Sequence, residues 1–172
     1  MQTLNMKHIN YLHKKNSTKK GTPKALGFSF LWKGLWIGVF LFLFSCNISP
    51  KKINYGSDGC HFCKMTIVDK VHAAEIVTKK GKVYMFDATE CMINFMDEFD
   101  TSQIELYLSN NYTEPEALID ATKATFLISK NIPSPMGAFL SAFKNKADAE
   151  KFQAEKGGDL YTWTELLAKF KD

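Results

Sequence analysis

Sulfur-bearing side chains are the residues of this 172-residue chain whose spacing best indicates chemistry. Cys60, Cys63 and Met65 lie within the six-residue run Cys-His-Phe-Cys-Lys-Met. Thiolates and thioethers are soft donors, and soft donors select copper(I) over hard ions such as magnesium or calcium. A thioether two residues after a thiol has no use in a dithiol redox site or a structural zinc site. The run therefore favours a copper(I) site.

A Cys-X-X-Cys pair on its own leaves other kinds of site open. A thioredoxin-like site would place the pair at the amino end of a helix, which lowers the thiolate pKa, whereas residues 65–68 are rich in β-formers. A structural zinc site needs four ligands, and the further candidates, Cys91, His61 and His72, lack the usual spacing. His61 is a weaker nitrogen-ligand candidate for copper. Outside the cytoplasm, a structural disulfide between Cys60 and Cys63 also competes.

Two further sulfur positions have distinctive surroundings. Met136 stands between Pro135 and Gly137, which fix the backbone of a turn, so we expect its side chain to be a metal ligand. Cys91 and Met92 form a second tier of candidates at the start of a predicted helix, where a methionine more often packs in the core. No motif of a catalytic acid, base or nucleophile accompanies these sulfur-bearing residues. The sequence therefore predicts no catalytic residue, and the chain is not expected to be an enzyme.

The elements that position these residues follow from the spacing of apolar and β-branched residues. Thr89 is expected to cap the first helix, and Gly157 and Gly158 to end the second. In chain order, the predicted elements are strands 72–78 and 82–86, a helix to Phe99, strand 104–108, strands 124–129 and 137–143, helix 147–155 and a strand entering a helix over 161–170. This order predicts an α+β fold, a single small domain of two ββαβ-like units.

The charge of the chain changes sign along its length. Residues 1–45 contain seven lysines and no acidic residue, whereas residues 46–172 contain 15 lysines and 18 acidic residues, a net charge of −3. The chain contains no arginine. Because nucleic-acid binding depends on neutralising phosphates with basic side chains, the acidic second part is not expected to bind nucleic acid.

The basic leader has the form of a secretory signal. Its apolar run, Gly34 to Phe44, is 11 residues long, and a membrane-spanning helix needs about 20, so an uncleaved signal anchor is the weaker alternative. The run ends in Leu-Phe-Ser-Cys at Cys46, which has the form of a lipobox. We therefore predict a lipoprotein signal peptide over 1–45, lipidation of Cys46, a polar tether over 46–59 and a copper-binding domain over 60–172.

Together these motifs resemble the NosL family, the lipoprotein accessory factors of nitrous-oxide reductase. The resemblance rests on the lipobox cysteine, the Cys-His-Phe-Cys-Lys-Met run, Gly-Lys-Val-Tyr-Met-Phe-Asp over 81–87 with Cys-Met behind it, and Pro-Met-Gly-Ala-Phe-Leu-Ser-Ala-Phe over 135–143. Carried over by position, the ligands would be Cys63, Met65 and Met136, with Cys60 as the next candidate. Lys64 stands where many members have glycine.

The resemblance also implies a fold, a cargo and partners. It implies an α+β domain of two ββαβ units that acts as a copper(I) chaperone for the maturation of nitrous-oxide reductase in denitrification. Its partners would be the membrane, through palmitate or another lipid on Cys46, and a copper-accepting enzyme or its assembly factors. The domain would lie in the cell envelope and face the periplasm. A thiol-disulfide oxidoreductase using Cys60 and Cys63, or a structural lipoprotein with a disulfide, are the alternatives.

Overall fold

A mixed β-sheet with helices packed against it forms the described part of the chain, which in this computed structural model is residues 48–171. The predicted signal peptide and Cys46 lie outside these residues. The elements in chain order are β1 (Ala74–Thr78), β2 (Val83–Phe86), α2 (Thr89–Asp97), β3 (Ile104–Asn111), β4 (Glu114–Asp120), β5 (Thr125–Ile128), β6 (Leu140–Phe143), α3 (Lys146–Lys156), β7 (Asp159–Thr162) and α4 (Trp163–Lys169). Among the described residues, no helix has the length and apolar character needed to cross a membrane.

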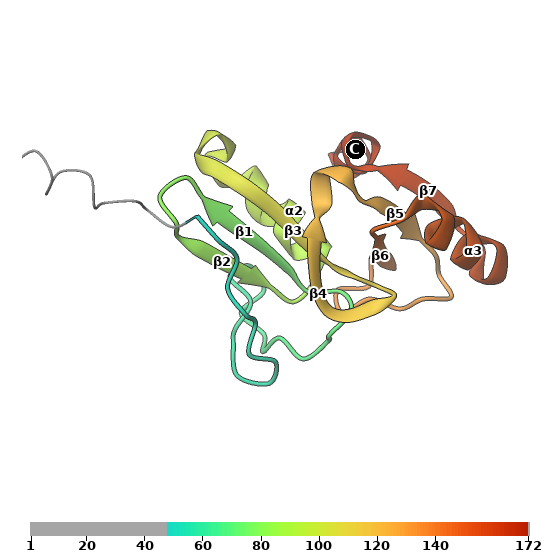
Figure 1. Ribbon diagram of the computed structural model, residues 1–172, viewed down its shortest axis with the longest axis horizontal. Coiled ribbons are helices and arrows are strands. Elements are labelled where there is room, and N and C mark those ends of the chain that lie inside the picture. Colours follow the sequence, from blue (N-terminus) through green and yellow to red (C-terminus); the bar gives the residue numbers. More distant parts are fainter. Residues whose placement is uncertain (1–47, 172) are drawn as a thin grey trace, which may run out of the picture. The chain divides into compact units, whose positions relative to one another are not determined.

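The sheet consists of two halves with the same internal order. The first half has the order β2-β1-β3 and the second has the order β6-β5-β7, so in each half the first strand lies in the centre. All pairs within a half are antiparallel. A single parallel pair, Asn111 with Ala142, joins β3 to β6. Figure 1 shows the halves side by side, with α2 in the first and α3 in the second. The predicted α+β fold of two ββαβ units is therefore confirmed.

The first half forms largely as the local sequence predicts. The β1–β2 hairpin turns at Gly81, whose φ of 75° lies in the left-handed region that favours glycine. The first five residues of α2, which include Cys91, Met92 and Ile93, are buried. The predicted cap at Thr89 is wrong, because Ala88 is the N-cap residue and no side chain caps the helix. The Thr89 hydroxyl instead pairs with that of Ser109 at 2.6 Å.

Two elements differ from the prediction. Strand β4, for which the sequence analysis assigned no element, pairs with β3 outside the main strand order. Its first three residues are exposed and include a proline, so they lack the alternation that identifies a half-buried strand. Strand β6 begins at Leu140 rather than at residue 137, because Gly137 and Phe139 both have positive φ angles, 77° and 58°. The residues before Leu140 form a turn.

The segment 51–59, predicted to be a tether, lies against the sheet. The Lys51 amide donates to the Glu75 carboxylate at 3.0 Å, and Ile53 is buried in the core. Further along, the Gly56 amide donates to the Ile67 carbonyl at 2.8 Å. The segment is thus held from Lys51 onward, by the Glu75 side chain of β1 and by the backbone of the loop before β1.

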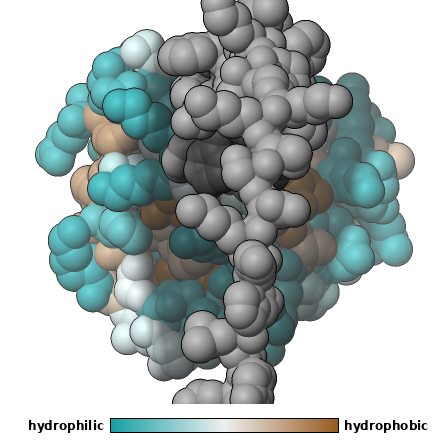
Figure 2. Space-filling view, turned by 60° about the vertical axis from the view of Figure 1, so that its left-hand side comes forward, coloured by the Kyte–Doolittle hydropathy of each residue, from teal (hydrophilic) through white to brown (hydrophobic). Residues whose placement is uncertain are grey.

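One apolar core extends through both halves. Ile76 and Phe86 from the first half and Phe126 and Leu166 from the second belong to the same buried cluster. Burying each such side chain contributes about 1.5–3 kcal/mol, so the shared core holds the halves together more strongly than the single β3–β6 pair does. Figure 2 shows a surface of mostly hydrophilic residues with hydrophobic residues in small groups among them. In contrast to these surface residues, the thiols described in the next section are mainly buried.

Candidate metal centre

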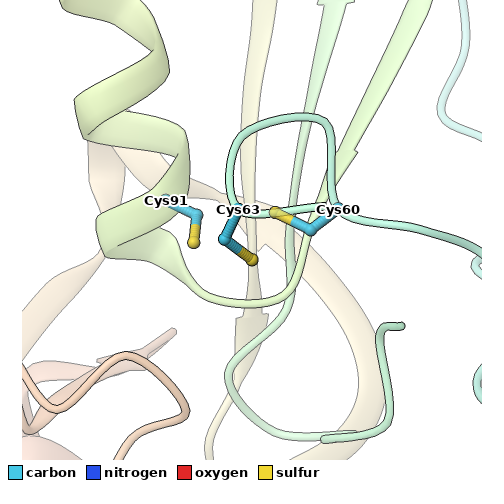
Figure 3. Close-up of side chains that lie close together, drawn as sticks. All are labelled: Cys60, Cys63 and Cys91. Carbon is cyan, nitrogen blue, oxygen red and sulfur yellow. The ribbon is translucent and has the colours of Figure 1, made fainter. Parts of the chain in front are cut away.

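Three cysteine side chains converge at one end of the first half. The sulfur atoms of Cys60, Cys63 and Cys91 all lie within 4.8 Å of one another. Cys60 and Cys91 are buried, Cys63 is partly exposed, and all three are free thiols. Figure 3 shows Cys60 and Cys63 extending from one loop and Cys91 from the helix beside it, with the sulfur atoms between the two elements. No other group of three or more such ligand residues occurs in the described chain.

A tight loop presents Cys60 and Cys63. The Cys60 amide donates to the Met65 carbonyl at 2.8 Å, and the Lys64 amide donates to the Cys60 carbonyl at 3.1 Å. Lys64 has a φ of 66°, in the left-handed region. This conformation is uncommon for a residue with a side chain and is compatible with glycine, the residue that many members of the resembled family have here. The loop geometry therefore places both thiols on the side that faces α2.

Strand β2 fixes this loop next to the helix that carries Cys91. The His61 amide donates to the Met85 carbonyl at 2.8 Å, and the Met85 amide donates to Nδ1 of His61 at 3.1 Å. The His61 ring also packs against Tyr84 and Phe86. Because β2 leads directly into α2, these contacts bring the loop to the first turn of the helix. These contacts of His61 thus hold the loop in place. One ring nitrogen, Nδ1, is already occupied by the hydrogen bond from the Met85 amide.

The three thiols differ in the direction in which their pKa values are shifted. The pKa of Cys60 is lowered to about 4, chiefly because the Cys91 side chain hydrogen-bonds to it, although burial opposes this effect. Backbone hydrogen bonds at Asp87, Cys63 and Phe62 lower it further. The pKa of Cys91 is raised, first because it donates to Cys60 and then because it is buried. Burial also raises the pKa of Cys63. Cys60 is therefore the most acidic of the three thiols.

The methionines fall into two groups. Met65 directly follows the cysteine loop and is 50% exposed, and Met136 in the turn before β6 is 40% exposed. Both are unusual, because only four large apolar side chains are exposed in the described residues. Met92 is fully buried in the core. The two exposed thioethers are accessible from solvent, whereas Met92 packs in the interior.

Cys91 had only second rank in the sequence analysis, and its place beside the other thiols is the main addition of the structure. The indication available in the sequence was its position in the first turn of a helix that directly follows a strand. Two acidic residues near it, Asp87 and Glu90, are both buried. Burial raises the pKa of Asp87. Glu90 hydrogen-bonds to Ser134 of the second half.

The chemistry of this donor set suits a soft, singly charged ion. Three sulfur donors with an accessible side leave a position at which a fourth donor can approach. Copper(I) prefers thiolate and thioether donors, whereas structural zinc sites almost always have four protein ligands. Metal binding requires deprotonated thiols and releases protons, and the lowered pKa of Cys60 favours this step. The cluster can therefore hold a soft metal ion and remain open to an incoming ligand.

Comparisons with known proteins agree with this chemistry. A family model described as NosL matches residues 51–170. The copper-binding lipoprotein NosL of Stutzerimonas stutzeri is 27% identical over 120 residues, which are 65% of this chain and 63% of that protein. The chain thus spans less than two thirds of the length of this curated relative. The crystal structure of the copper chaperone NosL from Shewanella denitrificans has a TM-score of 0.61 and 26% identity, covering 69% of this chain and 96% of that chain.

Proposed function

Because the chain belongs to the NosL family, we propose that it binds copper(I) as a cargo and passes the ion to an acceptor protein. The observation that carries this proposal is the convergence of Cys60, Cys63 and Cys91 within 4.8 Å. The relatives described above are named as a copper-binding lipoprotein and a copper chaperone, which supports the same cargo. Transfer of an ion between soft donors breaks no covalent bond of a substrate, so the chain acts without enzymatic catalysis.

The proposed ligands have separate roles. Cys60, Cys63 and Cys91 supply thiolates that fix the ion against α2, and Met65 and Met136 supply thioethers from the exposed side. Thioethers carry no charge and are displaced more easily than thiolates. An acceptor that brings its own sulfur or nitrogen ligands can therefore replace Met65 and Met136 first and reach the thiolates afterwards.

Anaerobic titration of the reduced domain with copper(I) against a competing chelator tests the proposal. We expect tight binding of one ion per chain. The lowered pKa of Cys60 favours one alternative, thiol-disulfide exchange with Cys63 as the second thiol, since reactive thiols have lowered pKa values. Reduction of a model disulfide without tight copper(I) binding would support that alternative and reject the chaperone.

The acceptor that we propose belongs to the nitrous-oxide reductase system, either the enzyme or one of its assembly factors. The family resemblance supports this proposal. Mixing the copper-loaded domain with copper-free nitrous-oxide reductase and following the metal by size-exclusion chromatography would test it. Retention of all copper by the domain, even with the assembly factors present, would point to a different copper enzyme.

Removal of the Cys46 thiol tests the proposed membrane anchor. The lipobox ending at Cys46 supports lipidation there, in the cell envelope on the periplasmic side, and each buried methylene of the lipid adds about 0.8 kcal/mol of membrane affinity. Cys46→Ser removes the attachment point. We expect this variant to appear in the soluble fraction or as an uncleaved precursor. Membrane fractionation and metabolic lipid labelling measure this, and continued labelling would place the lipid elsewhere.

Substitution of Met136 tests whether the second half contributes a ligand. Loss of an outer partner alone typically costs 10–100-fold in metal affinity, so we expect Met136→Leu to lower copper(I) affinity about tenfold or more. Because leucine nearly conserves the volume, the substitution should cost less than about 1.5 kcal/mol of stability. Chelator competition measures the affinity.

Met92→Leu is the matched control. Because Met92 is buried in the core, we expect this substitution to leave the copper(I) affinity unchanged. Loss of affinity in Met92→Leu, with Met136→Leu unaffected, would move the thioether ligand to α2.

A bound ion also stabilises the fold by linkage, by about 2.7 kcal/mol when free copper is 100-fold above the dissociation constant.

A further inference from the structure

A buried hydrogen bond joins the first turn of α2 to the turn that carries Met136. The Ser134 hydroxyl donates to Oε1 of Glu90 at 2.5 Å and accepts from the Phe139 amide at 2.9 Å. Glu90 is 2% exposed and Ser134 is 9% exposed. Forty-four positions separate the two residues in the sequence, so this contact connects the two halves of the domain.

Both ends of this bond adjoin proposed ligands. Glu90 directly precedes Cys91, and Ser134 stands two residues before Met136. The turn after Ser134 is closed by the Gly137 amide, which donates to the Ser134 carbonyl at 3.0 Å. Glu90 and Ser134 therefore link the helix that carries a thiol of the cluster to the turn that carries an exposed thioether.

The turn itself has a conformation that needs outside support. Phe139 has a φ of 58°, and a non-glycine residue in the left-handed region costs about 1–3 kcal/mol and persists only when its surroundings hold it. Its amide is the one that donates to Ser134. The chain of hydrogen bonds from Phe139 through Ser134 to Glu90 supplies this support from the first half.

The side chain that holds this turn, that of Glu90, is polar and buried. Burying a polar group costs free energy unless it is hydrogen-bonded, and the second oxygen of Glu90, Oε2, has no hydrogen-bond partner in the described structure. Buried polar groups without partners are rare in folded proteins. A purely structural contact between the halves could be made by apolar side chains at lower cost, which points to a role near the site.

We propose that Glu90 is a positioning residue that holds the Met136 turn beside the thiol cluster through Ser134. This proposal rests on the proposed function, because it assigns Glu90 to delivery of the Met136 thioether to copper(I). It adds that the geometry between the two halves is set by one side-chain hydrogen bond beside Cys91. Without that bond the three thiols remain in place, and only the thioether loses its position.

A double-mutant cycle tests the positioning role. We expect Ser134→Ala to lower copper(I) affinity about tenfold, as is typical for loss of an outer partner. In the Ser134→Ala background, Met136→Leu should then have no further effect, because residues that act as a unit are not additive. Chelator competition gives the affinities. The ¹³C-methyl NMR signal of Met136 should shift on addition of copper(I) in the parent protein and stay in place in Ser134→Ala.

Two further variants separate position from stability and from charge. Ser109→Ala removes another buried hydroxyl bond at the first turn of α2, the 2.6 Å contact with Thr89, and should destabilise the fold without changing copper(I) affinity. Glu90→Gln keeps an oxygen that can accept from Ser134, so the Met136 methyl signal should still shift on addition of copper(I). Circular dichroism follows the fold of each variant.

Several results would overturn the proposal. Parental affinity in folded Ser134→Ala, additive effects of Ser134→Ala and Met136→Leu, or an equal loss in Ser109→Ala would each remove the positioning role. Loss of the methyl shift in Glu90→Gln would show that charge rather than position matters, and this variant decides the question even if Ser134→Ala fails to fold. A parent protein that binds no copper(I) rejects the proposed function and, with it, this role.

Discussion

Cys91→Ser is expected to lower copper(I) affinity by about 100-fold or more. Serine nearly conserves the volume and can still donate a hydrogen bond to Cys60, but its hydroxyl is a hard, weakly acidic donor that copper(I) does not prefer. Loss of an outer partner typically costs 10–100-fold, and loss of a thiolate in direct contact with the ion should cost at least as much. Chelator competition gives the affinity, and X-ray absorption at the copper edge gives the number of sulfur neighbours, which should fall by one.

The neighbouring Met92→Leu is the matched control for this effect. Met92 follows Cys91 on the same helix turn and is equally buried, so a general disturbance of α2 would appear in both variants. Unchanged affinity in Cys91→Ser would take Cys91 out of the metal centre. The remaining ligands would then be Cys60, Cys63 and the exposed thioethers, which is the set that the family resemblance implies.

Oxidation of the Cys60 and Cys63 thiols to a disulfide should abolish tight copper(I) binding, with a loss of at least about 100-fold that a dithiol reductant reverses. The two sulfur atoms lie within 4.8 Å of each other, and a disulfide brings them to about 2 Å. The bond consumes two of the three thiolates, so Cys91 is left as the one thiol donor of the cluster. Titration of the protein before and after reduction measures the loss.

The double variant Cys60→Ser/Cys91→Ser is the control for the oxidation experiment, because its one remaining thiol of the cluster, Cys63, has no partner for a disulfide within the described part of the chain. Its weaker affinity should be the same with and without the reductant. Equal affinity of the oxidised and reduced parent protein would show that Cys60 and Cys63 lie outside the metal centre. It would leave the disulfide as a structural feature of the domain.

The parts of the fold that could be predicted are those whose signal is local. The β1–β2 hairpin follows from β-branched residues on either side of Gly81, and α2 follows from apolar spacing over Met92 to Phe99. Strand β4 gave no such signal, because its exposed start at Glu114 lies on the β3 edge and shows no alternation. Its strand conformation depends on pairing with β3, which a local pattern does not contain.

The residues of the candidate metal centre also fall into those that a local sequence pattern predicts and those that it does not. Cys60, Cys63 and Met65 stand in one short motif, so the sequence predicts them as a group. Cys91 joins them only because the loop hydrogen-bonds to Met85 at the end of β2, a contact between residues far apart in the sequence. The Glu90 contact with Ser134 is more distant still. No spacing rule connects these positions. Packing within the first half places Cys91 beside the other thiols, and packing between the halves places Glu90 against Ser134.

The docked segment that begins at Lys51 also determines how far an anchored domain can reach. With a lipid on Cys46, the five residues 47–51 would connect the lipidated cysteine to the first hydrogen bond with β1, from the Lys51 amide to the Glu75 carboxylate. A fully extended chain of five residues spans at most about 18 Å, which is less than the roughly 30 Å diameter of a small domain. A domain anchored in this way would stay within a thin layer over the bilayer. An acceptor that is itself held at the membrane would then meet it at a high effective concentration, whereas a freely diffusing acceptor would have to come to the surface.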